Sequence, residues 1–207
     1  MDITLLATAD WDHPFWTNKQ HVAVSLVELG HRVLYIDSLG LRPPTLAAGD
    51  RGRVSRRLRR CLAGPRQVQE GLWVVSPLQL PLRAGGWVDC CNRWLLEASL
   101  RLARWRLGWR RDLLWTYNPR TANLLGLSAY RRTLYHCVDA IDAQPGMDGP
   151  RLRRDEQLLC ERVDLVVTTT PFLQQRCAPR ARRCVQFANA VDIEHFQQAL
   201  DPQLPLP

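Results

Sequence analysis

Short runs of β-branched residues and leucine alternate along this chain with longer stretches of helical periodicity. The clearest example comes first: an apolar run at 3–7 precedes a helical stretch at 18–29, and a second apolar run follows at 32–37. Gly30 is a typical residue for ending the helix between them. Because two parallel strands must be joined by such a crossover helix, the pattern predicts a parallel sheet.

The same alternation continues to the end of the chain. It predicts further strands at 72–75, 112–117, 133–138, 164–169 and 183–188, and helices at 50–63, 87–109, 120–127, 152–161 and 172–176. The expected fold class is therefore α/β, with a parallel sheet of about six or seven strands and helices on both faces. We expect one domain over residues 1–200 and a linker-like, proline-rich tail over 201–207.

The composition is that of a globular protein rather than a membrane or disordered one. Of 207 residues, 46% are hydrophobic and 23% charged, and no run of about 18 apolar residues occurs. The first four residues lack the basic start of a signal peptide, so we expect a cytoplasmic protein. The seven cysteines show no C-x-x-C spacing, which indicates reduced thiols in the core.

The net charge of +8 comes almost wholly from arginine, since Lys19 is the only lysine. Such a balance favours an anionic partner, such as phospholipid, nucleic acid or a phosphorylated substrate. An arginine preference can also follow from genome composition alone. No recognised nucleic-acid-binding motif accompanies the charge, so a nucleic acid partner is not expected.

Candidate ligand contacts lie in the loops that follow the strands, because open parallel sheets bind ligands beyond the carboxyl ends of their strands. The first loop is rich in aromatic residues and leads into a helix whose N-terminus would favour an anion. From this and the later loops we expect substrate contacts at Asp12, His13, Trp16, Asn18, Lys19, Asn118, Asp142 and Asn189. The alternative for the first loop is that Trp11 and Trp16 simply cover the sheet.

Several catalytic motifs are absent from the sequence. There is no G-x-x-x-x-G-K-[ST] phosphate loop, no G-x-G-x-x-G after the first strand and no G-x-S-x-G elbow. Asp10 and Asp12 have the D-x-D form of a metal motif, but they directly follow the first strand and such a tripeptide arises easily by chance. We therefore expect no metal site.

The end of the chain resembles a family signature. Residues 189–196, Asn-Ala-Val-Asp-Ile-Glu-His-Phe, resemble the N-G-V-D-x-x-x-F motif of two-domain (GT-B) glycosyltransferases. Segments 10–43, 112–119, 134–142 and 156–170 resemble the motifs of a bacterial branch that includes teichuronic-acid-type, family 4-like enzymes. In this order and spacing the motifs cover nearly all of residues 1–200, so the chain is similar to the N-terminal domain of that family.

The resemblance implies a Rossmann-like, acceptor-side domain. It implies transfer of a sugar from a nucleotide-diphosphate sugar to a saccharide or lipid-linked acceptor in cell-surface polysaccharide synthesis, without a metal or other cofactor. Asp139 takes the place of the polar residue that faces the reacting sugar in relatives, so we expect it to be catalytic. A carboxylate there could accept a sugar hydroxyl or balance an oxocarbenium-like charge. The alternative is that Asp139 and Asp142 only cap their loop.

The chain also departs from the family. Ala190 stands where relatives have glycine in the closing motif, and the first loop carries aromatic residues where relatives often have glycines. Because only 201–207 follow the domain, we expect the donor-binding domain to be absent and the isolated chain to be inactive. The alternative is a non-catalytic binding domain, or a subunit whose donor-binding partner is a separate polypeptide.

Two segments are candidates for contact with the inner face of the plasma membrane. Arg56, Arg57, Arg59 and Arg60 lie in a dense cationic run that core packing does not explain. The predicted helix at 87–109 has several tryptophans along one face and arginines on another. A basic amphipathic helix with tryptophans fits an anionic lipid surface, whereas the alternative is a helix that packs on the core with a solvated arginine face.

Overall fold

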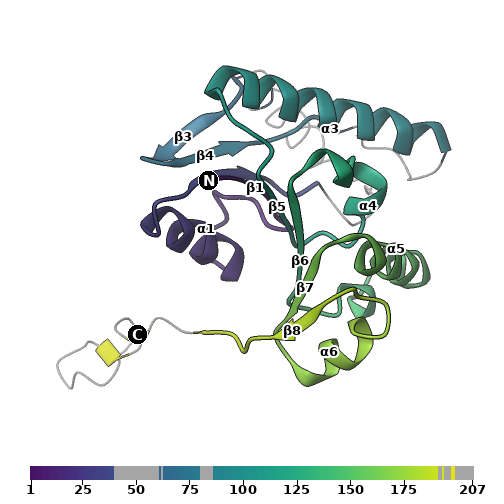
Figure 1. Ribbon diagram of the computed structural model, residues 1–207. Helices are drawn as coiled ribbons and strands as arrows, with labels where there is room; N and C mark the ends of the chain where they lie inside the picture. Colours follow the sequence, from purple (N-terminus) through teal and green to yellow (C-terminus); the bar gives the residue numbers. More distant parts are fainter. Residues whose placement is uncertain (40–60, 62, 80–85, 191–192, 194–196, 199–207) are drawn as a thin grey trace.

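The computed structural model describes residues 1–39, 61, 63–79, 86–190, 193 and 197–198. These residues form one sheet of eight strands, in the order β3-β4-β2-β1-β5-β6-β7-β8 (Figure 1). The strands are β1 (Asp2–Leu6), β2 (Arg32–Ile36), β3 (Arg66–Gln69), β4 (Leu72–Val75), β5 (Leu113–Thr116), β6 (Arg132–Cys137), β7 (Leu165–Thr168) and β8 (Cys184–Gln186). The helices are α1 (Asn18–Glu28), α3 (Gly86–Leu107), α4 (Thr121–Leu124), α5 (Gly149–Arg162) and α6 (Pro171–Cys177), with 3₁₀ turns η1 (Leu127–Ala129) and η2 (Ile141–Ala143).

The expected α/β fold class is confirmed. All neighbouring strands in the described sheet pair in parallel, except that β3 pairs with β4 in the antiparallel direction. The sequence did not indicate β3, because Arg66–Gln69 is mostly polar and exposed. Gly71, with a φ of 79°, allows the tight turn that joins β3 to β4.

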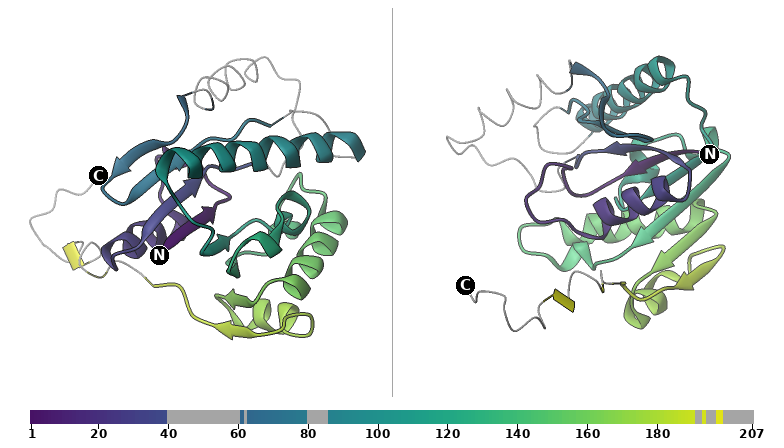
Figure 2. Two further views of the ribbon diagram at one scale, coloured as in Figure 1. Left: turned by 45° about the horizontal axis from the view of Figure 1, so that its top comes forward. Right: turned by 90° about the vertical axis from the view of Figure 1, so that its left-hand side faces the viewer.

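Helices cover both faces of the sheet, as expected (Figures 1 and 2). On one face, α1 packs Ala23 and Leu26 against alternate residues of β1, β2 and β5. On the other face, α3 packs Leu96 and Leu100 against the intervening residues of the same strands, and α5 and α6 cover β6 and β7. The alternation of side chains along each buried strand supplies both cores.

The predicted and observed elements agree to within a few residues in the described part of the chain. Leu29 shares the helical periodicity of the buried Leu26, but it lies at the C-terminal end of α1 and is 72% exposed. The predicted helix at 50–63 and the four arginines Arg56, Arg57, Arg59 and Arg60 fall mainly or wholly outside the described residues. The proposed tail at 201–207 also lies outside them.

Candidate functional site

The N-terminus of α1 directs a lysine toward the carboxyl end of the sheet. Thr17 and Gln20 form a capping box that fixes the start of the helix, and the Gln20 amide also donates to the Asp10 carbonyl oxygen across the first loop at 3.1 Å. Lys19, the second residue of α1, is consequently only 7% exposed. A buried ammonium group is costly unless an anion lies near it.

Asp139 supplies that anion from the loop after β6. Its Oδ2 lies 3.9 Å from the Lys19 Nζ, and its side chain is 58% exposed. Burial lowers the pKa of Lys19, and the Asp139 carboxylate partly offsets this effect. Two residues that the sequence proposed separately are thus brought together, with the lysine inside the protein and the carboxylate open to solvent.

His136 and Tyr117 form the floor beneath this pair. The Lys19 Nζ lies 5.8 Å from the centre of the Tyr117 ring, and the Tyr117 hydroxyl is within 3.2 Å of His136 Nδ1. Burial, and then the charge of Lys19, lower the pKa of His136 to about 4, so the imidazole is neutral at physiological pH. Burial raises the pKa of Tyr117. The floor is therefore polar but uncharged, beneath one cation and one exposed anion.

Sequence reasoning did not single out His136 or Tyr117. His136 is a polar residue near the end of the mostly buried strand β6, between Tyr135 and Cys137, which is the signal that could have identified it. Asn18, which was proposed, lies beside Lys19 at the start of α1, and its Oδ1 is buried with no hydrogen-bond partner among the described residues. We define the site as Lys19, Asp139, His136, Tyr117 and Asn18.

The other proposed residues of the first loop point elsewhere. Asp12 forms an ion pair of 2.8 Å with Arg66 on the edge strand β3. The exposed His13 ring interacts with the backbone of Phe15 within its own loop. Trp16, 45% exposed, packs against Trp11, which is itself buried over the sheet. The loop therefore covers the sheet and also leaves an aromatic surface in solvent.

The later loops place their proposed residues differently. Asn118 is buried, and its Oδ1 accepts a hydrogen bond of 2.9 Å from the Arg120 backbone N–H, so that oxygen orders the turn before α4. The Asp142 side chain is 2% exposed and pairs with both Arg153 and Arg176. Those arginines outweigh the effect of burial and hold the pKa of Asp142 below its usual range. Asn189 is exposed beyond β8, two strands past β6.

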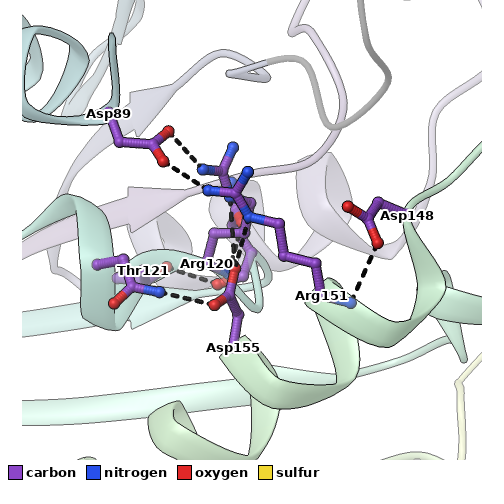
Figure 3. Close-up of polar contacts among 8 residues, drawn as sticks. Asp89, Arg120, Thr121, Asp148, Arg151 and Asp155 are labelled. Carbon is purple, nitrogen blue, oxygen red and sulfur yellow. Dashed lines mark hydrogen bonds and ion pairs between the residues drawn. The ribbon is translucent and has the colours of Figure 1, made fainter. Parts of the chain in front are cut away.

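A network of arginines and aspartates joins the loops behind the site to α3 (Figure 3). Arg120 lies 2.9 Å from Asp89 of α3 and 3.5 Å from Asp155 of α5. Arg151 contacts the same two carboxylates, and Asp148 caps α5 by accepting from the Arg151 backbone N–H. Because Arg120 follows β5 and Asp148 precedes α5, the network fixes both segments relative to α3.

A cavity of about 320 Å³ lies between α5 and α6, on the face of the sheet opposite α1. Beside it, possible ligand atoms of Cys137, Glu156 and Cys177 lie within 4.8 Å of one another. The Glu156 carboxylate already accepts a hydrogen bond of 2.7 Å from the Tyr135 hydroxyl and pairs with Arg176. A guanidinium group in contact with this carboxylate disfavours a metal cation, so the cluster is explained as a buried ion pair among thiols.

No helix in the described ranges is both long and apolar enough to span a bilayer. Comparison with protein-family profiles gives no match, and comparison with curated proteins gives none either. The structure is similar to that of a sucrose-phosphate synthase from Thermosynechococcus elongatus, with 10% sequence identity and a TM-score of 0.58 over 97% of this chain and 95% of that chain. At this identity the likeness shows the fold alone. The chain therefore has a Rossmann-like α/β fold similar to that of the synthase.

Proposed function

We propose that this chain is the acceptor-side domain of a glycosyltransferase and that the Lys19–Asp139 site holds a hydroxyl-bearing saccharide. The observation that carries the proposal is the exposed Asp139 carboxylate above a neutral, polar floor at the carboxyl edge of the sheet. A carboxylate in that position can accept a hydrogen bond from a sugar hydroxyl. The partly exposed Trp16 of the first loop, which precedes Lys19 closely in the sequence, offers an apolar face for a sugar ring.

Three members of the site have distinct parts in this proposal. Asp139 accepts the proton or hydrogen bond of the reacting hydroxyl, and Lys19 stabilises the negative charge that develops as the diphosphate leaves. His136 stays neutral because of its lowered pKa, so it can donate or accept a hydrogen bond without repelling Lys19. The nucleotide-sugar donor is held mainly by a second domain, on the same chain or on a separate one, and no metal takes part.

Saturation-transfer difference NMR on the full chain, residues 1–207, can test the proposal. The probes are maltose and lactose as saccharides, and UDP-glucose and GDP-mannose as nucleotide sugars. We expect saccharide signals that fall at least about fivefold in Asp139→Ala and in Lys19→Met, because each change removes a polar contact of roughly 1 kcal/mol. Nucleotide-sugar signals are expected to be weaker.

Asp12→Asn is the matched control, because Asp12 is an exposed carboxylate of the first loop that pairs with Arg66 instead of Lys19. Saccharide signals that persist in Asp139→Ala, or that fall equally in Asp12→Asn, would contradict the assignment of the site. Strong UDP-glucose or GDP-mannose signals from the chain alone would contradict the placement of donor binding on a second domain.

A further inference from the structure

Three tryptophans of α3 point into solvent. Trp87, Trp94 and Trp105 are 66%, 69% and 78% exposed. Large aromatic side chains are normally buried, and a row of them on one surface helix indicates a contact surface. The glycosyltransferase proposal does not use these residues, and the following inference is independent of it.

The three tryptophans form a straight stripe. They are separated by 7 and 11 residues, which is about two and three turns of an α-helix, so they share one side of α3 over roughly 27 Å. The core-facing residues Leu96 and Leu100 are fully buried on the opposite side. Figure 1 shows α3 along the outer border of the described fold.

The charged residues of α3 that are exposed are all arginines. Arg101 lies within about 40° of the tryptophan stripe around the helix axis, and Arg93 and Arg106 lie roughly 110° from it, one on each side. The two acidic residues of the helix are used internally: Asp89 pairs with the arginines of the network, and the Glu97 Oε1 accepts a hydrogen bond of 2.9 Å from the Gly126 backbone N–H. The described surface of α3 therefore offers tryptophan and positive charge together.

We propose that this face of α3 docks onto an anionic lipid bilayer, with the helix axis parallel to the membrane plane. Tryptophan prefers the boundary between headgroups and acyl chains, and flanking arginines attract anionic headgroups. A second copy of this chain is a poorer occupant, because a twofold contact through the same face would bring the three arginines of one copy against those of the other. A basic partner protein is disfavoured for the same reason.

Vesicle sedimentation with the full chain tests this docking. The probes are vesicles of phosphatidylcholine alone and of phosphatidylcholine mixed with phosphatidylglycerol. We expect binding to the mixed vesicles that weakens as salt rises, since the arginine contribution is screened. The triple variant Trp87→Ala, Trp94→Ala and Trp105→Ala should bind at least about tenfold more weakly, and alanine keeps the helix intact.

An aromatic control separates the stripe from general hydrophobicity. Phe172 and Phe187 are also exposed, at 64% and 66%, but lie on α6 and just after β8. The double variant Phe172→Ala and Phe187→Ala should therefore bind vesicles like the unmodified chain, and circular dichroism should show the same helix content for all variants.

A charge-matched pair of triple variants tests the arginines. Replacing Arg93, Arg101 and Arg106 with glutamine should reduce binding to the anionic vesicles about tenfold or more. Replacing three exposed arginines elsewhere, Arg154, Arg162 and Arg182, removes the same charge and should have a smaller effect. Equal losses in the two triple variants would show nonspecific attraction and overturn the assignment to α3.

Two further results would overturn the proposal. The first is equal vesicle binding by the tryptophan triple variant and the unmodified chain. The second is no vesicle binding at all. If the chain then also self-associates in sedimentation velocity, and the tryptophan triple variant abolishes that self-association, the face is assigned to a second copy of the chain.

Discussion

Replacing Asp139 with asparagine is expected to lower the pKa of Lys19, because the Asp139 carboxylate partly offsets the burial of that ammonium group. The measurement is unusually direct, since Lys19 is the only lysine in the sequence. Reductive methylation with carbon-13 formaldehyde labels this side chain and the N-terminal amine, and an NMR titration follows each signal separately. The unmodified chain should already show a Lys19 pKa below that of an exposed lysine.

The size of the effect follows from the geometry. Two unit charges 3.9 Å apart interact by about 1 kcal/mol in water and by about 4 kcal/mol at an effective dielectric constant near 20. Because the Asp139 side chain is 58% exposed, the lower figure applies. Asp139→Asn should therefore remove about 1 kcal/mol of stabilisation from the protonated form of Lys19, which the titration records as a lower Lys19 pKa.

The same change has a consequence for stability. Between the lowered pKa of folded Lys19 and the higher pKa of the unfolded lysine, the unfolded chain binds more protons, so stability rises with pH across that interval. Asp139→Asn moves the lower end of the interval to lower pH. Asp12→Asn is the control, because Asp12 pairs with Arg66. If the two variants give the same Lys19 pKa, the Lys19–Asp139 contact does not form in solution.

Two further predictions concern the floor of the site and the network behind it. The pKa of His136 is lowered to about 4 in the folded chain, so as pH falls below about 6.5 the imidazole becomes protonated first in the unfolded chain. His136 should therefore reduce the free energy of unfolding by roughly 3 kcal/mol by pH 4. His136→Phe should remove that part of the pH dependence in urea unfolding, and parallel curves for both proteins would refute it. Arg120→Ala should destabilise the fold by about 2 kcal/mol, because Asp89 and Asp155 lose a shared partner. The exposed pair of Arg180 makes Arg180→Ala a control expected to cost less than about 1 kcal/mol, and equal losses would contradict the role given to the network.

Most of the fold could be predicted from local patterns. The strands β2, β4, β5 and β7 consist mostly of consecutive apolar residues, as expected for strands that are covered on both faces of a sheet. The antiparallel edge strand β3 could not be predicted, because a mostly exposed strand has no hydrophobic signal and depends on its pairing with β4. The segment at 50–63 lies mainly outside the described residues, so its predicted helix remains a prediction.

The candidate site could be predicted only in part. The rule that ligands bind beyond the carboxyl ends of parallel strands led to Lys19 and Asp139, which do lie close together. The same rule selected Asp12 and Asp142, whose carboxylates instead pair with arginines from β3, α5 and α6. The rule locates a loop but not the direction of a side chain, which depends on the charges that neighbouring elements present.

The sequence by itself determined the succession of buried strands and helices along the chain, because hydrophobic periodicity is a local property of the chain. Tertiary structure alone decided which side chains meet and which remain exposed. It placed neutral His136 and Tyr117 beneath Lys19, and it directed the tryptophan stripe of α3 outward. Helical spacing shows that residues share a side of a helix, but only packing of Leu96 and Leu100 on the sheet fixes which side is buried. That physical difference, between periodicity along one element and contact between elements, separates what could be predicted here from what could not.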